Sequence, residues 1–204
     1  MKNVAVVKYN AGNIYSVIHA LGRLGIQPIV TDDAATLRTA DYVIFPGQGE
    51  ACKTMDYLRS HALDKLICSL TQPVLGICIG MQLMCAHSEE GDTNCLGIFD
   101  VPVKKFHAPK HEFKIPHMGW DTLTQVKGNL FHEIKEESFV YFIHSYYVAL
   151  CPDTIATNDY ILPFSAAIHK DNFYATQFHP EKSGSIGEKI LQNFLELPLN
   201  THTA

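Results

Sequence analysis

The chain lacks the sequence signatures of a nucleic-acid-binding surface, a metal site or a disulfide framework. Its 16 Lys and Arg residues are outnumbered by 21 Asp and Glu residues, and no basic run offsets that balance. Because nucleic acid is bound through basic patches, it is a poor candidate for a partner. The 6 cysteines include no C-x-x-C pair and the 11 histidines no H-E-x-x-H motif. We therefore expect reduced cysteines and neither a metal nor another cofactor.

Long hydrophobic runs are also missing. The opening residues lead directly into the short apolar segment 4–7, which reads as a strand rather than a signal peptide, and no run approaches the length of a membrane span. We therefore expect a cytoplasmic protein. The 204 residues, with no internal repeat or low-complexity linker, predict a single domain spanning residues 1–204.

Apolar segments alternate with helical patterns through the first half of the chain. Short strands followed by amphipathic helices predict a parallel sheet with right-handed crossovers. In the second half, strands follow one another through short links, which favours antiparallel pairing. We predict strands at 4–8, 27–31, 42–45, 73–77, 101–106, 139–150, 155–157, 164–169 and 173–178, and helical segments at 14–24, 33–38, 50–70, 79–87 and 185–195, with a polar turn at 87–97 and an irregular loop at 107–120.

One stretch, the Gly-Ile-Cys-Ile-Gly segment at 76–80, organises the rest. Cys78 falls where a strand becomes a helix, and Gly76 and Gly80 flank it at the spacing of a nucleophile elbow. The partial positive charge of the helix N-terminus favours the thiolate form of Cys78. The ordinary alternative is a small core cysteine between two turn glycines.

Two other segments are predicted at the same edge of the sheet. The Pro-Gly-Gln-Gly loop at 46–49 follows the third strand, where ligands of parallel sheets bind. The Gln-Phe-His-Pro-Glu segment at 177–181 ends the last strand, with His179 held extended by Pro180. Alone, the loop could be a plain turn and His179 a surface histidine. Together, Cys78, His179 and Glu181 supply a nucleophile, a base and a residue that orients the base.

These segments together resemble the class I (triad) glutamine amidotransferases, and the likeness covers nearly the whole chain. It implies a three-layer, flavodoxin-like α/β fold with a central, mostly parallel sheet and added antiparallel strands. Met81 follows Gly80 where the anthranilate and aminodeoxychorismate subunits of the family usually carry His. The segments 9–16, 116–121 and 141–146 look like those of the glutaminase subunits of imidazole glycerol phosphate synthase, which belong to histidine biosynthesis.

The resemblance implies glutamine hydrolysis through a covalent thioester. Cys78 attacks the side-chain amide, His179 protonates the departing ammonia, and water then releases glutamate. The expected oxyanion hole combines the N–H of Ile79 with the loop that contains Gly47, Gln48 and Gly49; the family usually carries a small branched residue at the position of Gln48, which leaves the flexibility of this loop open. Residues that match substrate-binding positions of the family are Gln82, Glu90, Ser145 and Tyr146. For Glu90, the alternative is a solvated loop acid.

The family passes ammonia through a tunnel to a partner, which the resemblance identifies as a cyclase subunit with a (βα)8-barrel fold. The resemblance implies that this heterodimer makes imidazole glycerol phosphate and AICAR. Asn13, Tyr141 and Lys182 match positions that face the cyclase, and the single tryptophan, Trp120, is expected in a loop as an interface anchor. For each of these residues, ordinary surface or core packing is the alternative.

Three other functions remain open from the sequence. The first is a glutaminase subunit of another, chorismate-linked amidotransferase. The second is a cysteine hydrolase of γ-glutamyl or peptide bonds, which could use the same three residues. The third is a binding module with a flavodoxin-like sheet and no activity, in which replacement of Cys78 would leave function intact.

Overall fold

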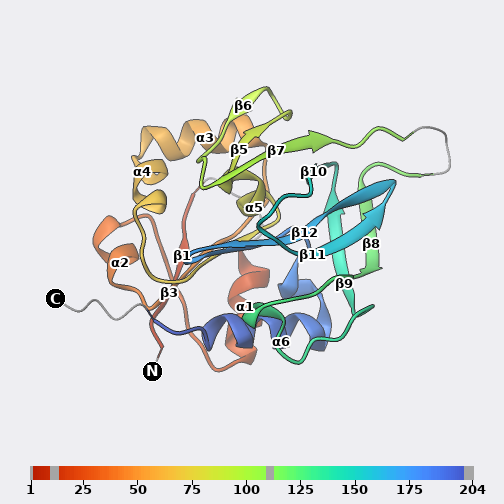
Figure 1. Ribbon diagram of the computed structural model, residues 1–204. Coiled ribbons are helices and arrows are strands. Elements are labelled where there is room, and N and C mark those ends of the chain that lie inside the picture. The colour runs from red at the N-terminus through yellow and green to blue at the C-terminus, as the bar shows by residue number, and fades with distance from the viewer. Residues whose placement is uncertain (1, 10–13, 109–112, 200–204) are drawn as a thin grey trace.

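The computed structural model describes residues 2–9, 14–108 and 113–199. Its first half alternates strands and helices, as the sequence predicts (Figure 1). These elements are β1 (Val4–Val7), α1 (Tyr15–Arg23), β2 (Ile29–Thr31), α2 (Ala34–Thr39), β3 (Tyr42–Phe45), α3 (Ala51–Ser60), α4 (Leu63–Cys68), β4 (Val74–Ile77) and α5 (Ile79–Met84).

The second half consists mainly of strands. They are β5 (Cys85–Ser88), β6 (Thr93–Asn94), β7 (Phe99–Lys105), β8 (His117–Thr122), β9 (Phe139–His144), β10 (Tyr146–Val148), β11 (Thr154–Tyr160), β12 (Leu162–Lys170) and β13 (Phe173–Thr176). Two short 3-10 turns, η1 (Asn129–Phe131) and η2 (Pro180–Lys182), and the helix α6 (Gly184–Leu195) complete the described chain. None of the helices within the described ranges combines the length and apolar character required to cross a bilayer.

Eleven strands of the described chain form one sheet. Its order is β2-β1-β3-β4-β13-β12-β10-β7-β5-β6, with β11 paired to β12. The pairs from β2 to β13 are parallel, and the pairs from β13 to β7 are antiparallel. The predicted mixed α/β fold is therefore confirmed. Because β3, β4 and β13 are parallel neighbours, the three segments that follow them emerge at the same edge of the sheet.

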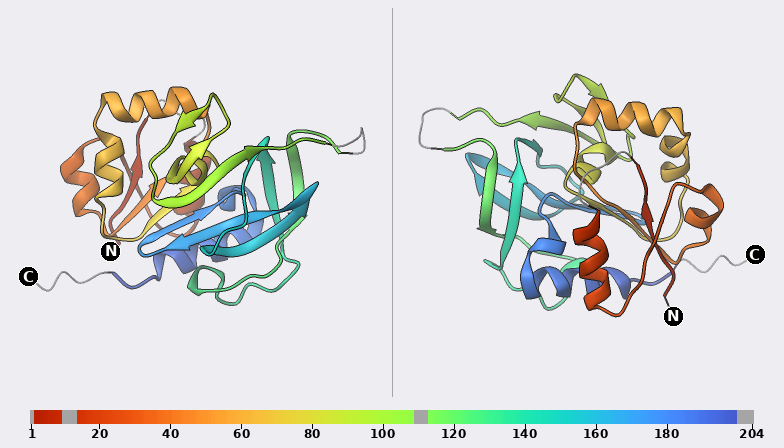
Figure 2. Two further views of the ribbon diagram at one scale, coloured as in Figure 1. Left: turned by 45° about the horizontal axis from the view of Figure 1, so that its top comes forward. Right: turned by 180° about the vertical axis from the view of Figure 1, so that it is seen from behind.

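Helices cover the two faces of the parallel region, giving three layers (Figure 2). Successive side chains of a strand point to opposite faces, so Val4 and Val6 pack in the cluster that includes α1 and α6, whereas Ala5 and Val7 pack with α2, α3, α4 and α5. All four side chains are buried. A strand buried on both faces explains the continuous apolar run at 4–7.

A separate two-stranded ribbon, β8–β9, corrects the expected loop at 107–120. Trp120 lies in β8 opposite Tyr141 rather than in a loop, so that prediction is wrong. Pro116 and Gly119 are poor strand formers, which made the segment look irregular in the sequence. Backbone pairing with β9 across six registers outweighs those preferences. The ribbon lies at the opposite end of the molecule from α2 and α4 (Figure 2).

Three predicted elements also differ from the structure in type or continuity, beyond small shifts at the ends of other strands. The helix expected to reach His87 ends at Met84, and residues 85–88 instead form β5, which pairs with β7 and with β6 in the predicted turn. The helical segment 50–70 divides into two helices at Ala62, whose φ of +55° breaks the helix. The strand expected at 139–150 divides into β9 and β10 at Ser145. The changes at 85–88 and at Ser145 follow from pairing with distant strands, which local sequence does not encode.

Candidate active site

Cys78 joins β4 to α5 in a strained backbone conformation. Its φ of +52° and ψ of −107° are rare for a residue with a side chain and cost about 1–3 kcal/mol. Two backbone hydrogen bonds hold the turn: the N–H of Cys78 donates to the carbonyl of Thr176 at 2.7 Å, and its carbonyl accepts from the N–H of Gln82 at 3.2 Å. The predicted strand-to-helix elbow is therefore confirmed, and β13 helps to support it.

The two elbow glycines are required by close contacts. A Cβ atom on Gly80 would lie 2.2 Å from the carbonyl oxygen of Phe45, the last residue of β3. A Cβ atom on Gly76 would lie 2.9 Å from the sulfur of Met84 and 3.0 Å from the backbone of Gly80. The 2.2 Å distance to backbone is too short for any side chain, so position 80 admits only glycine without rearrangement. At position 76 a side chain would require the sulfur of Met84 to move and the backbone of Gly80 to give slightly.

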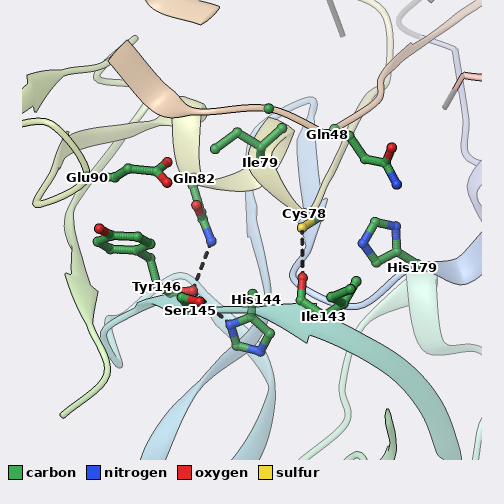
Figure 3. Close-up of a pocket in the computed structure, with 12 residues that line it drawn as sticks. Gln48, Cys78, Ile79, Gln82, Glu90, Ile143, His144, Ser145, Tyr146 and His179 are labelled. Carbon is green, nitrogen blue, oxygen red and sulfur yellow. Dashed lines mark hydrogen bonds between the residues drawn. The ribbon is translucent and has the colours of Figure 1, made fainter. Parts of the chain in front are cut away.

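His179 and Glu181 form a buried pair beside this elbow. The Nδ1 atom of His179 lies 2.7 Å from Oε1 of Glu181, and both side chains are almost fully buried. The carboxylate can only accept, so the proton of neutral His179 lies on Nδ1 and the lone pair on Nε2. The Nε2 atom is buried without a hydrogen-bond partner. Figure 3 shows the His179 ring next to Cys78.

The electrostatics of this pair favour a protonated His179 when the sulfur is ionised. Burial lowers the pKa of His179, but a Cys78 thiolate and the Glu181 carboxylate outweigh burial and raise it to about 10. In the geometry observed, the thiol of Cys78 instead donates to the carbonyl of Ile143, with 3.8 Å between sulfur and oxygen (Figure 3). The arrangement can thus transfer the thiol proton to Nε2 once the thiol turns from Ile143.

Backbone contacts anchor His179 to the β8–β9 ribbon. The N–H of His179 donates to the carbonyl of Tyr141 at 2.9 Å. The buried hydroxyl of Ser183 donates to the carbonyl of His179 at 2.7 Å and accepts from the N–H of Tyr141 at 2.9 Å. Ser183 is a positioning residue that the sequence did not indicate, because one of its partners, Tyr141, comes from a distant strand.

A pocket of about 320 Å³ opens in front of Cys78, and we call it the Cys78 pocket. It brings together the predicted nucleophile and base with every predicted oxyanion and substrate-binding residue; Glu181 lies behind His179 and does not line it. The lining residues are Gly47, Gln48, Gly49, Cys78, Ile79, Gln82, Glu90, Ile143, His144, Ser145, Tyr146 and His179 (Figure 3). Its volume suits a small molecule. Among the described residues, no three His, Cys, Asp or Glu side chains converge as metal ligands.

Two polar side chains lie at the far end of the pocket. The Nε2 atom of Gln82 donates to the carbonyl of Tyr146 at 2.9 Å and to Oε1 of Gln177 at 3.0 Å. Glu90 accepts a hydrogen bond, at 2.8 Å, from the N–H of Ala51. Ala51 is the first residue of α3. Burial raises the pKa of Glu90, and the Ala51 N–H opposes that rise. Glu90 is thus a partly buried carboxylate that faces the pocket, where a ligand ammonium would pair with it.

The 46–49 loop is packed tightly against the elbow. A Cβ atom on Gly47 would lie 2.2 Å from the carbonyl of Ile77 and 2.6 Å from the backbone nitrogen of Ile79, so only glycine fits there. The buried hydroxyl of Tyr9 donates to the carbonyl of Pro46. Burial and the charge of a Cys78 thiolate raise the pKa of Tyr9, and the backbone N–H of Gln48 opposes that rise. Tyr9 therefore stays protonated and holds the loop.

A pair of buried histidines supports the wall of the pocket and was not predicted. The Nδ1 atom of His144 lies 2.8 Å from the carbonyl of Tyr146, and its Nε2 lies 3.2 Å from Nδ1 of His117. His117 is stacked on Tyr160 at 3.9 Å. Burial lowers the pKa of His144 to about 3, so the ring is neutral. The sequence signal was the apolar surroundings of both histidines, which are typical of core residues.

Three of the predicted partner residues, Trp120, Tyr141 and Lys182, lie outside the pocket. Trp120 is 55% exposed, and its ring packs edge-on against Tyr141 with 6.0 Å between centroids. Tyr141 precedes the pocket wall on β9, and Lys182 directly follows Glu181 in η2. These three residues lie on elements that contact one another. Asn13 lies outside the described residues.

The known proteins that are similar to this chain point to one family. A family model, "Glutamine amidotransferase class-I", matches residues 5–197. The chain is 62% identical over 194 residues to the imidazole glycerol phosphate synthase subunit HisH of Bacteroides thetaiotaomicron, covering 95% of this chain and 99% of that protein. It is 45% identical over 197 residues to the imidazole glycerol phosphate synthase subunit HisH of Yersinia pestis, covering 96% of this chain and 100% of that protein.

Solved structures support the fold. PurLQS from Thermotoga maritima aligns with a TM-score of 0.70 at 19% identity, covering 96% of this chain and 98% of that chain. A crystal structure of a glutamine amidotransferase aligns with a TM-score of 0.73 at 18% identity, covering 95% of this chain and 98% of that chain. At such identities the likeness concerns the fold alone.

Proposed function

Because the chain belongs to the class I glutamine amidotransferase family, we propose that it is the glutaminase subunit of an imidazole glycerol phosphate synthase. The observation that carries this proposal is the high identity to HisH subunits along nearly the whole chain. The Cys78 pocket supports it, since a buried thiol and a base that is paired with the Glu181 carboxylate face a cavity of suitable size for glutamine.

The chemistry begins with transfer of the Cys78 proton to Nε2 of His179. The sulfur then attacks the side-chain carbonyl carbon of glutamine, and the N–H of Ile79 with the 46–49 loop stabilises the negative oxygen. The carbon–nitrogen bond breaks as His179 returns its proton to the leaving ammonia. Water, deprotonated by His179, hydrolyses the thioester and regenerates the thiol with release of glutamate. Glu181 holds the imidazole in the tautomer that these steps require.

Substrate orientation follows from the two ends of the pocket. Glu90 pairs with the α-ammonium of glutamine, while Gln82 and the backbone at Ser145 and Tyr146 hydrogen-bond the remaining polar groups. The N–H of Ala51 ties Glu90 to α3, directly after the 46–49 loop. Substrate binding is thereby linked to the segment that contains the oxyanion donors.

Ammonia released in water is lost by protonation, so the reaction requires a partner. The partner is a cyclase subunit with a (βα)8-barrel fold, and Trp120, Tyr141 and Lys182 contribute to the contact, with Asn13 as a further expected member. The exposed tryptophan supports this assignment because aromatic side chains anchor protein interfaces. The resulting heterodimer delivers ammonia to the cyclase reaction.

The decisive experiment measures glutamate release from glutamine by the purified chain, alone and with the cyclase and its nucleotide ligand. We expect little activity alone and strong stimulation by the liganded cyclase. Cys78→Ala should lower glutamine-dependent turnover by roughly 10⁴- to 10⁶-fold, because the nucleophile is lost. The same variant should support full cyclase activity when ammonia is added.

Matched assays separate this function from the alternatives. Hydrolysis of peptides or other γ-glutamyl compounds in preference to glutamine would indicate a cysteine hydrolase. Stimulation by a chorismate-converting enzyme instead of the cyclase would indicate another amidotransferase. Strong glutaminase turnover without any partner would contradict the proposed coupling, and intact function in Cys78→Ala would contradict catalysis.

A further inference from the structure

The side chain of Gln177 is buried between the nucleophile and the substrate-binding end of the pocket. It is inaccessible to solvent and belongs to the segment between β13 and His179. Its Nε2 atom lies 3.7 Å from the sulfur of Cys78, within hydrogen-bond reach of a sulfur acceptor. Its Oε1 atom accepts from Nε2 of Gln82 at 3.0 Å.

The direction of this contact is set by a backbone carbonyl. The oxygen and nitrogen of an amide are distinguished only through their partners. The carbonyl of Tyr146 can only accept, so the atom of Gln82 that faces it is the nitrogen (Figure 3). The same nitrogen faces Gln177, which must therefore present its oxygen to Gln82. An N–H group of Gln177 is left to point at the sulfur of Cys78.

One hydrogen-bond partner of the sulfur, the carbonyl of Ile143, cannot stabilise negative charge. In the neutral state, the thiol donates its proton to the carbonyl of Ile143 at 3.8 Å. Once that proton leaves, the partly negative oxygen of the Ile143 carbonyl faces the negatively charged sulfur. Since Cys78 is 9% exposed, solvent compensates little for the loss. The Gln177 N–H is a side-chain donor already aimed at the charge that develops.

We propose that Gln177 is a catalytic residue that stabilises the Cys78 thiolate by donating an N–H hydrogen bond to its sulfur. In this step the S–H bond of Cys78 breaks, the proton bonds to Nε2 of His179, and the electron pair stays on the sulfur. Gln82 holds Gln177 in the donating orientation, so one network connects the substrate-binding end of the pocket to the nucleophile. The inference rests on the proposed glutaminase function for its role in turnover.

The test measures alkylation of Cys78 by iodoacetamide across pH 5–10, without substrate, by mass spectrometry of the peptide that contains Cys78. Only the thiolate reacts, so the rate reports its population. Gln177→Met removes the donor and keeps the side-chain length. We expect alkylation at pH 7 to fall about tenfold and its half-maximal pH to rise by about one unit, the size of a charged hydrogen bond.

A second variant separates the contact with sulfur from support of Gln82. Gln177→Glu still accepts from Gln82, but its carboxyl group is a stronger acid than the thiol and ionises first, so it offers the sulfur only acceptors. We expect the half-maximal pH to rise in this variant as well. Gln192→Met, the same change on the exposed side of α6, is the control and should match the wild type.

Two outcomes overturn the inference. One is a half-maximal pH that stays at the wild-type value in Gln177→Met, whatever Gln177→Glu shows, because a carboxylate beside the sulfur opposes the thiolate by its charge alone. The other is a change in Gln177→Met but not in Gln177→Glu, which would mean that Gln177 acts only by holding Gln82. Far-UV circular dichroism establishes that each variant is folded. Because the alkylation assay contains no glutamine or cyclase, its result stands apart from the test of the proposed function.

Discussion

Contacts between individual backbone atoms determine the conformation of the strand-to-helix turn at Cys78. The positive φ of Cys78 is tolerated because backbone hydrogen bonds to Thr176 and Gln82 offset its strain. Gly76 and Gly80 also leave room for the turn. The carbonyl of Phe45 occupies the space where a side chain of residue 80 would begin. The position of the Cys78 sulfur therefore depends on the absence of side chains at Gly76 and Gly80 as well as on the hydrogen bonds of the turn.

At this scale, we predict that Gly80→Ala destabilises the fold and removes activity. The added methyl group would lie 2.2 Å from the Phe45 oxygen, and backbone must shift to admit it. We expect a loss of about 3 kcal/mol in the free energy of unfolding, measured by urea titration.

Gly22→Ala is the matched control. Gly22 lies in α1 with no atom within 4 Å of an added Cβ, so alanine should raise the free energy of unfolding by about 0.5–1 kcal/mol. A Gly80→Ala chain as stable as the wild type would refute the close-contact explanation.

The β8–β9 ribbon links an exposed surface to His179, the proposed catalytic base. Trp120 and Tyr141 are paired across its strands, and the carbonyl of Tyr141 accepts from the N–H of His179. A partner that binds this ribbon thus acts on an element in direct hydrogen-bond contact with the base. The wall residues Ile143 and His144 lie further along the same strand.

At the element scale, we predict that Trp120→Ala weakens cyclase binding without unfolding the chain. The side chain is more than half exposed, so its removal costs the isolated fold little. Loss of an aromatic interface anchor typically costs at least 2 kcal/mol, which corresponds to about a 30-fold rise in Kd, measurable by isothermal titration calorimetry.

The control for that prediction is Ile29→Ala. Ile29 is 47% exposed on β2, an edge strand of the eleven-stranded sheet that does not include the β8–β9 ribbon, so its replacement should leave the Kd unchanged. Equal affinity of Trp120→Ala and wild type for the cyclase would exclude Trp120 as an anchor.

Across the whole molecule, buried titratable groups link stability to pH. Burial lowers the pKa of His144 from an ordinary 6.5 to about 3 in the folded chain. The unfolded chain therefore binds a proton that the folded chain does not, between these two values. The contribution of His144 to stability is complete above about pH 6.5 and is lost as the pH falls toward 3.

We predict that the free energy of unfolding falls with acid partly through this residue. Its contribution to the slope approaches about 1.4 kcal/mol per pH unit between pH 6 and 4. His144→Gln keeps a donor for the Tyr146 carbonyl and should show a shallower slope in urea titrations over this range. His19→Gln, on the exposed side of α1, should keep the wild-type slope, and equal slopes for all three chains would rule out the linkage.

Local sequence was sufficient for the elbow and for the alternating half of the fold. The glycines beside Cys78, the apolar run at 4–7 and the proline after His179 each act through neighbouring backbone, so their effect is readable from spacing. Since β3, β4 and β13 end at one edge, the segments that follow them were also expected together.

Only tertiary structure decided what surrounds the sulfur and how the base is held. Strand β8 follows Pro116 and contains Gly119, and it forms because β9 pairs with it. The contact of Gln177 with Cys78 joins residues 99 positions apart, and Ser183 meets Tyr141 from 42 positions away. Spacing along the chain does not specify such contacts, because they depend on which strands become neighbours in the sheet and how their side chains pack.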